Sequence, residues 1–536
     1  MIKKYIKGYA YYVTLLVITC ILFTNVSYET LNKENKLNSF NVNNNAINLK
    51  NELYIDEEIY MSYEDIQSIL GNDVYVDKIS RKIIVTSKDN IRKYELNTTK
   101  KQSNFVVEDT GKAIYIKKNE KDYLLLEEIA NMYNYQLVFN TKLNSLNLVT
   151  QDKVIGVLNS NRVYGYLEKS DKNTRVILTD YNIEIVKNEE FVDKNCIYYT
   201  AIMQKDEVEQ VVYVLKKDIT ITDNEDNVND IVNSKFYTMF FTEDSKSIDQ
   251  ATNAIVLEGL RITSKNGSIE NNINDEKVRE AIESNKEVYI SISNGYASTN
   301  YDNSITTHML QSDVARENII LAIKNAINNE KINGVVINFR QLNSGCKEDF
   351  TQFIKEISAY LHSLDKKVLV YVPLNATYIN LIDITSYLDY AILIQYGTKE
   401  VTSKTSGTHS GINWIQTNLE QLKENNIEMS KIIIEIPLYS IVWTEKNNKV
   451  IDAEWINMRA LEEYISKNEL THNLDEASKQ NYIEYVKGSL KYKIWLEDIY
   501  SVKQKIDLAK MFELAGVSLY KKGYESQSLL TELGGN

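Results

Sequence analysis

An arginine closes an apolar run near the middle of the chain. The segment Lys331 to Leu342 reads KINGVVINFRQL, and its β-branched residues without polar alternation are typical of a buried strand in a parallel sheet. Arg340 stands at the carboxyl end of this run. A guanidinium stays protonated at any usable pH, so Arg340 can neither give a proton to a leaving group nor take one from water. Asn333 and Asn338 in the same run offer only hydrogen bonds, and Val336 offers none.

Carboxylates that could perform acid–base chemistry lie in other segments. Glu348 and Asp349 follow the run closely and could swing toward it, but such residues are more often in the first turn of the next helix. Glu435 and Glu258 lie inside two other apolar runs. A buried arginine without a counter-ion is very costly, so we expect Arg340 to pair with Glu435 or Glu258. In a competing interpretation, Arg340 holds a hydroxyl or an anionic group of a ligand.

Metal, cofactor and nucleic-acid chemistry have little support. The formal net charge of -13 argues against a nucleic-acid partner, because binding to phosphates needs dense Lys and Arg. No Gly-rich phosphate loop or Ser-His-Asp pattern is evident, so we expect no cofactor. Cys196 and Cys346 are far apart and are interpreted as unpaired thiols. A metal site is not expected, because no ligand spacing joins the four histidines, which are His308, His362, His409 and His472.

From about residue 235, apolar runs alternate with helix-like segments to the end of the chain. Eight such runs over roughly 300 residues match the size of a (β/α)8 TIM barrel, whose chemistry sits at the carboxyl ends of its strands. We therefore expect an α/β fold with a TIM barrel over 235–536 and Arg340 at its mouth. The strand candidates are 236–241, 253–260, 287–293, 332–339, 367–374, 389–396, 431–439 and 515–520.

The amino-terminal half contains an internal repeat. The segments 60–87 and 123–150 match position for position, pairing Ile66 with Ile129 and Val85 with Leu148. Each copy predicts a short amphipathic helix followed by a two-strand hairpin, so that two copies can bury one shared face. The repeat resembles the stalk domain named after the amino-terminal domain of copper amine oxidases. That name implies no copper here, and we expect a duplicated α+β stalk domain over 51–152.

The remaining segments precede and follow this stalk in the sequence. Residues 153–221 hold short β-rich runs and predict a small β-barrel-like domain, whose closing VYVLKKDI resembles the end of an SH3-like domain of wall proteins. The acidic stretch 222–234 predicts a linker. Residues 1–27 place lysines before an apolar run, which predicts export by a signal peptide or an uncleaved membrane anchor. The polar residues 28–50 predict a flexible spacer.

The barrel segment carries motifs that resemble, in order, those of glycoside hydrolase family 18, the chitinase-like fold. INGVVINFR resembles the fourth-strand signature D-G-x-D-x-D-x-E, and SISN (291–294) resembles the third strand. LIQY (393–396) and IPLYSIVW (436–443) resemble the sixth and seventh strands. The tail 495–525 is similar to the cell-wall and spore-associated branch. The resemblance covers about 235–530.

This sequence departs from the family pattern at the positions of the catalytic residues. In the family, the terminal Glu protonates the glycosidic oxygen, and an Asp two residues earlier orients the substrate's N-acetyl carbonyl as nucleophile. The four acidic positions here are Asn333, Val336, Asn338 and Arg340, and none is a carboxylate. Loss of general acid catalysis alone typically removes a factor of about 10² to 10⁴. The resemblance therefore implies no catalytic residue of the usual kind.

A sugar-binding surface can survive this loss. Tyr396 matches the family's sixth-strand Tyr, which contacts the N-acetyl group, and Tyr520 replaces the Trp on which the family seats its sugar. The alternative is that the aromatic residues only pack the barrel mouth. Glu497 and Asp498 match an acidic pair of the family and are as readily structural as functional. The expected substrate-binding residues are Asn294, Asn338, Arg340, Gln395, Tyr396, Tyr439, Trp443 and Tyr520.

These observations predict an exported protein of the cell envelope. We expect a barrel that does not hydrolyse glycan but binds an N-acetylglucosamine-containing glycan, peptidoglycan rather than chitin, or scaffolds wall and spore-coat proteins. The other expected partner is the membrane, through residues 1–27, and neither nucleic acid nor metal is expected. Two alternatives stay open. One is an active glycosidase that hydrolyses peptidoglycan or a chitin-like glycan with non-standard carboxylates, and the other is a protein-binding role of the stalk.

Overall fold

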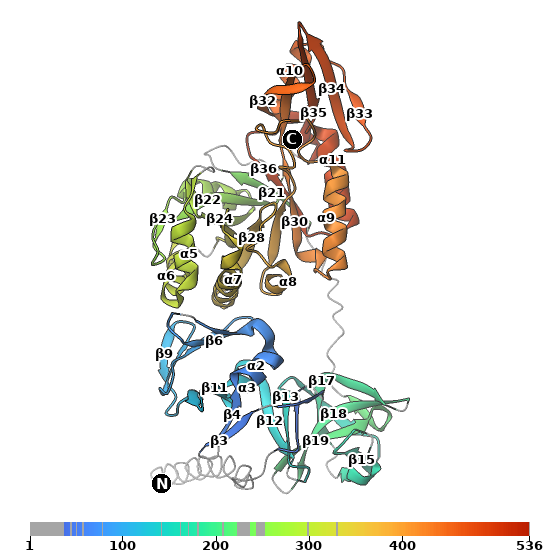
Figure 1. Cartoon of the computed structure of the whole chain (residues 1–536). Coiled ribbons are helices and arrows are strands. Elements are labelled where there is room, and N and C mark those ends of the chain that lie inside the picture. Colours follow the sequence, from blue (N-terminus) through green and yellow to red (C-terminus); the bar gives the residue numbers. More distant parts are fainter. Residues whose placement is uncertain are drawn as a thin grey trace, which may run out of the picture. The chain divides into compact units, whose positions relative to one another are not determined.

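The computed structural model describes two compact units of the chain (Figure 1). The first unit contains Met1–Val74, Tyr94–Gln102 and Val107–Asn229, and the second contains Tyr75–Lys93, Ser103–Val106 and Asp230–Asn536. The predicted leader and linker lie outside the described residues. Within the predicted flexible spacer, residues 39–42 and 45–47 form strands, which corrects that part of the prediction, and the predicted domain boundaries stay predictions. The described residues are 37–42, 45–49, 51–55, 58–77, 79–140, 142–160, 162–169, 171–178, 182–193, 195–205, 208–221, 236–242, 252–296, 300–328 and 331–534.

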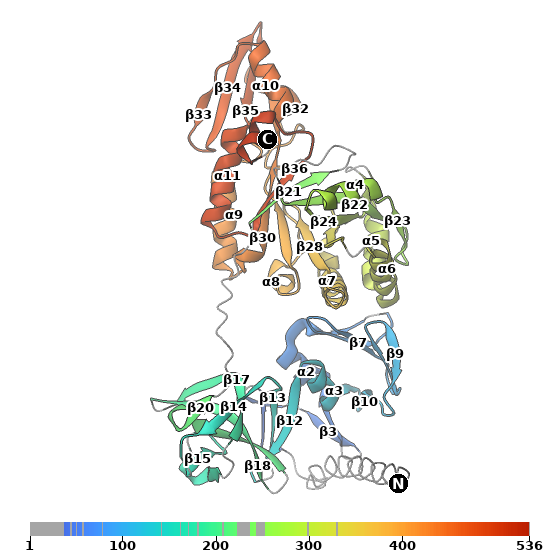
Figure 2. The same cartoon turned by 180° about the vertical axis from the view of Figure 1, so that it is seen from behind.

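A closed barrel of eight parallel strands forms the second unit, which confirms the predicted fold (Figure 2). All eight predicted runs form strands of this barrel. In sheet order these strands are β21 (Tyr237–Thr242), β36 (Gly516–Tyr520), β30 (Ile432–Pro437), β29 (Tyr390–Ile394), β28 (Lys367–Val372), β27 (Gly334–Asn338), β24 (Glu287–Ser293) and β22 (Ala254–Ile262), and a β21–β22 pairing closes the ring. The short β23 (Ile269–Asn271) pairs antiparallel with the last residues of β22.

The spacing of the strands depends on residue size at close contacts. A Cβ atom at Gly334 would lie 2.0 Å from the backbone oxygen of Lys367, so only glycine lets β27 and β28 approach at this point. The barrel interior is filled by buried side chains such as Met239, Tyr289 and Leu369. A second apolar layer separates the strands from the outer helices. These helices are α4 (Asp275–Glu283), α5 (Asn303–Gln311), α6 (Asp313–Ala326), α7 (Lys347–His362), α8 (Leu381–Ile384), α9 (Ile412–Glu424), α11 (Ile499–Met511) and α12 (Gln527–Glu532).

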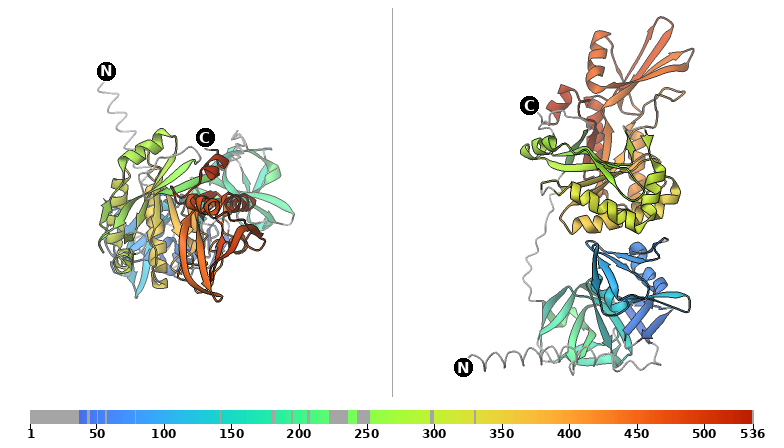
Figure 3. Two further views of the ribbon diagram at one scale, coloured as in Figure 1. Left: turned by 90° about the horizontal axis from the view of Figure 1, so that it is seen from above. Right: turned by 90° about the vertical axis from the view of Figure 1, so that its left-hand side faces the viewer.

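An antiparallel sheet that the sequence reading did not predict is inserted after β30. It rises from the carboxyl ends of the barrel strands (Figure 3). Helix α10 (Met458–Lys467) covers one face, where Leu461, Ile483 and Ile494 form a small core. The strand order is β32 (Lys449–Asn457), β31 (Tyr439–Lys446), β35 (Leu490–Trp495), β34 (Gln480–Lys487) and β33 (Asn473–Asp475).

The first unit is rich in sheet, and both copies of the repeat form the predicted helix and hairpin. The first copy has α2 (Tyr63–Leu70) before β5 (Val74–Val76) and β6 (Ile83–Thr86), and the second has α3 (Leu126–Met132) before β12 (Tyr135–Asn140) and β13 (Ser145–Thr150). Ser62 caps α2, because its side chain accepts a hydrogen bond from the Asp65 backbone at 3.2 Å. The other strands of the repeat region are β1 (Ser39–Val42), β2 (Asn45–Ile47), β3 (Glu52–Ile55), β4 (Glu58–Ser62), β7 (Ile91–Tyr94), β8 (Lys100–Ser103), β9 (Val106–Asp109), β10 (Tyr115–Lys118) and β11 (Lys121–Leu125).

Seven antiparallel strands follow the repeat, as the short β-rich runs predicted. Their likeness to an SH3-like domain stays a prediction. In sheet order they are β16 (Arg175–Leu178), β15 (Val163–Tyr166), β19 (Val208–Leu215), β18 (Cys196–Lys205), β17 (Asn182–Asp193), β14 (Lys153–Leu158) and β20 (Ile219–Ile221). Over the residues described, none of the helices has both the length and the apolar character that a membrane crossing requires.

Part of the first repeat belongs to the barrel unit. Residues 75–93 pack on α6 and α7, where Ile84 and Ile91 are fully buried against Ala359. Arg316 of α6 is also fully buried. Its Nη2 lies 3.2 Å from Asp77 Oδ2 and 3.0 Å from Glu356 Oε1, and its Nη1 donates to the Leu310 backbone oxygen at 2.7 Å. The hairpin therefore contributes both apolar contacts and a buried carboxylate to the barrel unit.

His362 gives this packing a pH dependence. Its Nε2 lies 2.9 Å from Asp389 Oδ2 and its Nδ1 3.3 Å from the Lys88 backbone oxygen. Both partners are acceptors, so both bonds exist only when the imidazole is protonated. The hydrogen bond to Asp389 raises the pKa of His362.

We therefore expect the melting temperature to fall as pH rises past neutrality. A folded-state pKa above the unfolded value means that the stabilisation is full below about pH 6.5 and is lost as pH rises through the folded pKa. Thermal melts between pH 5.5 and 8.5 check this, with His362→Gln as the comparison. The variant should lose this part of the slope, and identical slopes in both proteins would contradict the assignment.

Candidate functional site

Polar side chains gather above the apolar filling of the barrel, at the carboxyl ends of the strands. Successive residues of a strand point to opposite faces, so Val336 and Asn338 share the inner face of β27, and Arg340 follows two residues after the strand ends. The neighbouring strands add Tyr371 from β28, Glu435 from β30 and Ser518 from β36. Tyr396 and Tyr520 extend this layer toward the mouth, as does Tyr439 at the start of β31.

Arg340 is half-buried and fixed at its backbone. The Asn294 side chain donates to the Arg340 backbone oxygen at 3.0 Å and accepts from its backbone nitrogen at 2.8 Å. The side chain of Arg340 donates from Nε to Asn338 Oδ1 at 2.8 Å. Asn294 therefore positions the Arg340 backbone, and the expectation that Asn294 also contacts a sugar stays a prediction.

Glu435 is fully buried beneath this layer. Its Oε1 accepts from the Tyr396 hydroxyl at 2.7 Å, and its Oε2 accepts from Ser518 Oγ at 3.3 Å. Burial raises the pKa of Glu435, although the bond from Tyr396 and the charge of Arg340 oppose that rise. Both carboxyl oxygens are thus engaged by neutral hydroxyl groups.

The predicted ion pair of Arg340 is corrected by this arrangement. Within the described ranges, no direct ion pair joins Arg340 to a carboxylate, because Glu435 is turned toward Tyr396 and Ser518. Burial would lower the pKa of Arg340, but Tyr396, Tyr301 and Glu435 together raise it, so the guanidinium keeps its charge. Glu258, the other predicted counter-ion, is exposed on β22.

Aromatic rings surround the mouth. The Tyr396 ring centroid lies 6.0 Å from those of Tyr520 and Tyr439, and Tyr520 stacks on Phe241 at 5.6 Å. Tyr439 also lies 6.2 Å from Trp455 of β32, whose side chain is 62% exposed. The sequence reading missed Trp455, because it did not foresee the inserted sheet. An exposed Trp beside half-buried Tyr rings forms a surface on which sugar rings can pack.

Two predicted sugar contacts are buried inside the protein. Trp443 is fully buried, and its Nε1 donates to the Gly407 backbone oxygen at 3.0 Å. Gln395 is buried and accepts a hydrogen bond from Asn418 of α9 at 3.1 Å. Trp443 belongs to the inserted sheet and Gln395 follows β29, and both side chains are engaged inside the protein, which corrects the expectation that they bind substrate.

The alternative carboxylates also have structural contacts. Asp349 is buried in the first turn of α7 and accepts from the Tyr75 hydroxyl at 3.0 Å, while Glu348 is exposed on the same turn. Asp498 caps α11 by accepting from the Ser501 backbone at 2.9 Å. Glu497 is buried 2.5 Å from Lys505 Nζ, and burial raises the pKa of Glu497 to about 7.

Asn333 and the histidines were considered as catalytic or metal-binding residues. Asn333 accepts from the Val288 backbone at 2.8 Å, at the opposite end of β27 from Arg340. His409 is buried, and burial lowers its pKa to about 3, so it is neutral. In the part of the chain that the structure describes, no three His, Cys, Asp or Glu side chains form a group that could hold a metal ion.

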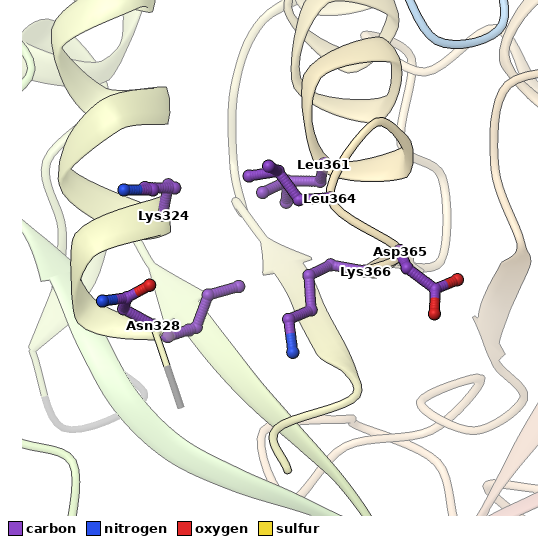
Figure 4. A pocket seen from close by; sticks show the side chains of 7 residues that line it. Lys324, Asn328, Leu361, Leu364, Asp365 and Lys366 are labelled. Atoms are coloured by element: carbon purple, nitrogen blue, oxygen red, sulfur yellow. The ribbon is translucent and has the colours of Figure 1, made fainter. Parts of the chain in front are cut away.

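A cavity of about 340 Å³ lies at the other end of the barrel. Figure 4 shows Lys324 and Asn328 from the end of α6 facing Leu361 and Leu364 from the end of α7. Lys366, which also lines it, donates to the Ile332 backbone oxygen at 2.7 Å. Because this end holds the amino termini of β27 and β28, the cavity is separate from the Arg340 site.

Comparisons with known proteins agree on the barrel. The model of the family described as glycosyl hydrolases family 18 matches residues 194–525. The uncharacterized glycosylase YvbX of Bacillus subtilis is 25% identical over 239 residues, which cover 42% of this chain and 68% of that protein. A chitinase structure from Chromobacterium violaceum is 18% identical with a TM-score of 0.50, covering 56% of this chain and 98% of the chitinase. The spore cortex-lytic enzyme SleL of Bacillus cereus is 14% identical with a TM-score of 0.51, covering 56% and 74%.

Proposed function

This chain belongs to glycoside hydrolase family 18, and from that premise we propose that its barrel binds a glycan without hydrolysing it. The observation that carries the proposal is the guanidinium of Arg340 in the position where the family motif has its proton-donating Glu. A general acid must give up a proton within hydrogen-bond reach of the leaving oxygen. Arg340 keeps its proton at all usable pH values, because its neighbours raise its pKa further.

The other carboxylates near the mouth support the same conclusion. Glu435 is fully buried, and Tyr396 and Ser518 occupy both of its oxygens. Asp349 is held by Tyr75 at α7. An acid that is already bonded on both oxygens and closed off from solvent cannot reach a glycosidic oxygen without rearrangement of the barrel.

The surface at the mouth fits an N-acetylglucosamine-containing glycan. Tyr396, Tyr439 and Tyr520 offer aromatic faces for pyranose rings, and Asn338 and Arg340 offer hydrogen-bond donors. We propose peptidoglycan as the glycan, because the tail motif resembles the cell-wall and spore-associated branch of the family. This ligand places the protein in the cell envelope, with residues 1–27 as export signal or membrane anchor.

Two measurements test the proposal on the full chain. Calorimetry with peptidoglycan oligosaccharides should show binding, and mass spectrometry of the same mixtures after long incubation should show intact oligosaccharides. Substitution of Arg340 by Glu should not create turnover, since Val336 and Asn338 still lack the carboxylates that orient the N-acetyl nucleophile. New reducing ends from purified protein would contradict the proposal, as would the absence of binding.

An active glycosidase remains the second candidate, and one observation favours it. Burial raises the pKa of Glu435, and a raised pKa is what a carboxyl group needs to act as a general acid near neutral pH. If the mixtures do contain cleaved products, Glu435→Gln should abolish them. Persistence of the products in that variant would exclude Glu435 as the acid.

A further inference from the structure

The terminal nitrogens of Arg340 are available to a ligand. Nε is bonded to Asn338, and the backbone is bonded to Asn294. Among the residues the structure places, none bonds to Nη1 or Nη2, and the side chain is only half-buried. Arg presents its donors in a planar fork that matches the two oxygens of a carboxylate.

The positive charge of the site is less buried than its negative charge. Arg340 reaches solvent, whereas Glu435 is fully buried and engaged by Tyr396 and Ser518. An anion that bonds to the outer face of the guanidinium is close to the positive charge and farther from the negative one. Since Coulomb energy falls with distance, the mouth attracts a single anionic group despite the buried Glu435.

The position of Arg340 in the motif indicates where on a glycan this anion would be. In the family that the motif resembles, the motif's terminal residue acts on the glycosidic oxygen, and we carry this placement over to Arg340. In a strand of alternating N-acetylglucosamine and N-acetylmuramic acid, the oxygen O4 of the muramic acid is such a linkage atom, and the neighbouring O3 carries a lactyl group that ends in a carboxyl. A donor placed beside the linkage oxygen is therefore beside the lactyl group as well.

We propose that Arg340 binds the free lactyl carboxylate of muramic acid, so that the barrel prefers peptide-free peptidoglycan strands. This inference rests on the proposed function and names the ligand of the same site. When a stem peptide is attached, the lactyl carboxyl is an amide and carries no charge. Hydrolysis of that amide adds water across the C–N bond and releases the peptide as an amine, which leaves the carboxylate. A reaction of this class must precede binding.

The test compares two forms of one probe on the full chain. The first is the peptide-free tetrasaccharide of alternating N-acetylglucosamine and N-acetylmuramic acid, and the second is the same molecule with its lactyl carboxyls converted to methylamides. Calorimetry at low ionic strength should give about tenfold tighter binding of the acid form. The difference should shrink at high salt, because a half-buried charge is partly screened.

Arg340→Gln should abolish the difference between the two forms, since glutamine keeps hydrogen bonding but has no charge. The matched control is Arg279→Gln, an exposed arginine on α4, which should retain the difference. Melting curves confirm that each variant is folded. Equal affinity of the wild type for both forms, or a difference that persists in Arg340→Gln, overturns this inference alone. If neither form binds, the proposed function falls together with it.

Discussion

Replacement of Arg316 by methionine is expected to lower the free energy of unfolding of the barrel unit by about 3–5 kcal/mol. The side chain is fully buried and lies between Asp77 and Glu356, which are also fully buried. Without the arginine, two carboxylates would remain in a low-dielectric interior with no cation between them. Urea denaturation followed by tryptophan fluorescence measures the effect. All four tryptophans of the chain lie in the barrel unit.

A matched variant distinguishes the loss of a buried charge from the general effect of replacing an arginine by methionine. Arg279→Met changes an exposed arginine on α4 and should shift the free energy of unfolding by less than about 0.5 kcal/mol. The triple variant Arg316→Met, Asp77→Asn, Glu356→Gln should recover part of the loss, because neutral amides need no counter-ion and Asp77→Asn keeps an oxygen for the bonds from the Ile79 and Ser80 backbone. A loss below about 1 kcal/mol in Arg316→Met would show that the buried charges are better solvated than this packing implies.

The barrel could be predicted because its strands are buried on both faces. Parallel strands covered by helices have continuous apolar runs, and KVLVYV and KIIIEIP carry that signal in their own letters. Boundaries were less accurate. The run 332–339 was predicted as a strand, but β27 covers only Gly334–Asn338, because backbone pairing and not composition decides where a strand ends.

Two features of the fold depend on contacts distant in sequence and could not be predicted in this way. The run 431–439 was predicted as one strand, yet β30 ends at Pro437 and β31 begins at Tyr439 in a different sheet. The hairpin 75–93 reads as part of a repeat, yet Asp77 finds its partner at Arg316. The local sequence pattern predicts the type of element, but it does not predict that Asp77 contacts Arg316, which is 239 positions away in the sequence.

The site was predictable in part. Side chains alternate between the two faces of a strand, which places Asn338 and Arg340 on one face. By the same rule, if Tyr396 faces the barrel interior then its neighbour Gln395 faces outward, and Gln395 does bond to Asn418 of an outer helix. That signal was present in the sequence and was not used. The burial of Glu435 and its bond to Tyr396 were not predictable, because they depend on how three strands meet.

Substitution of Tyr396 by alanine is expected to weaken binding of the peptidoglycan tetrasaccharide by about a hundredfold, the loss typical of a central aromatic contact. Its ring lies 6.0 Å from both Tyr439 and Tyr520, so its removal takes a central ring out of the aromatic surface. The same change removes the hydroxyl bonded to Glu435 and should cost about 1–3 kcal/mol of stability. Calorimetry and urea denaturation measure the two effects.

Tyr396→Phe distinguishes the ring from the hydroxyl. It keeps the aromatic face and loses only the bond to Glu435, so affinity should fall by no more than about tenfold. Tyr390→Ala is the matched control, because Tyr390 begins β29, whose opposite end precedes Tyr396, and affinity should stay within about twofold. If Tyr396→Ala binds as well as Tyr390→Ala does, sugars do not contact the mouth of the barrel. The glycan would then have to bind elsewhere on the chain, and Arg340 would have only a structural role.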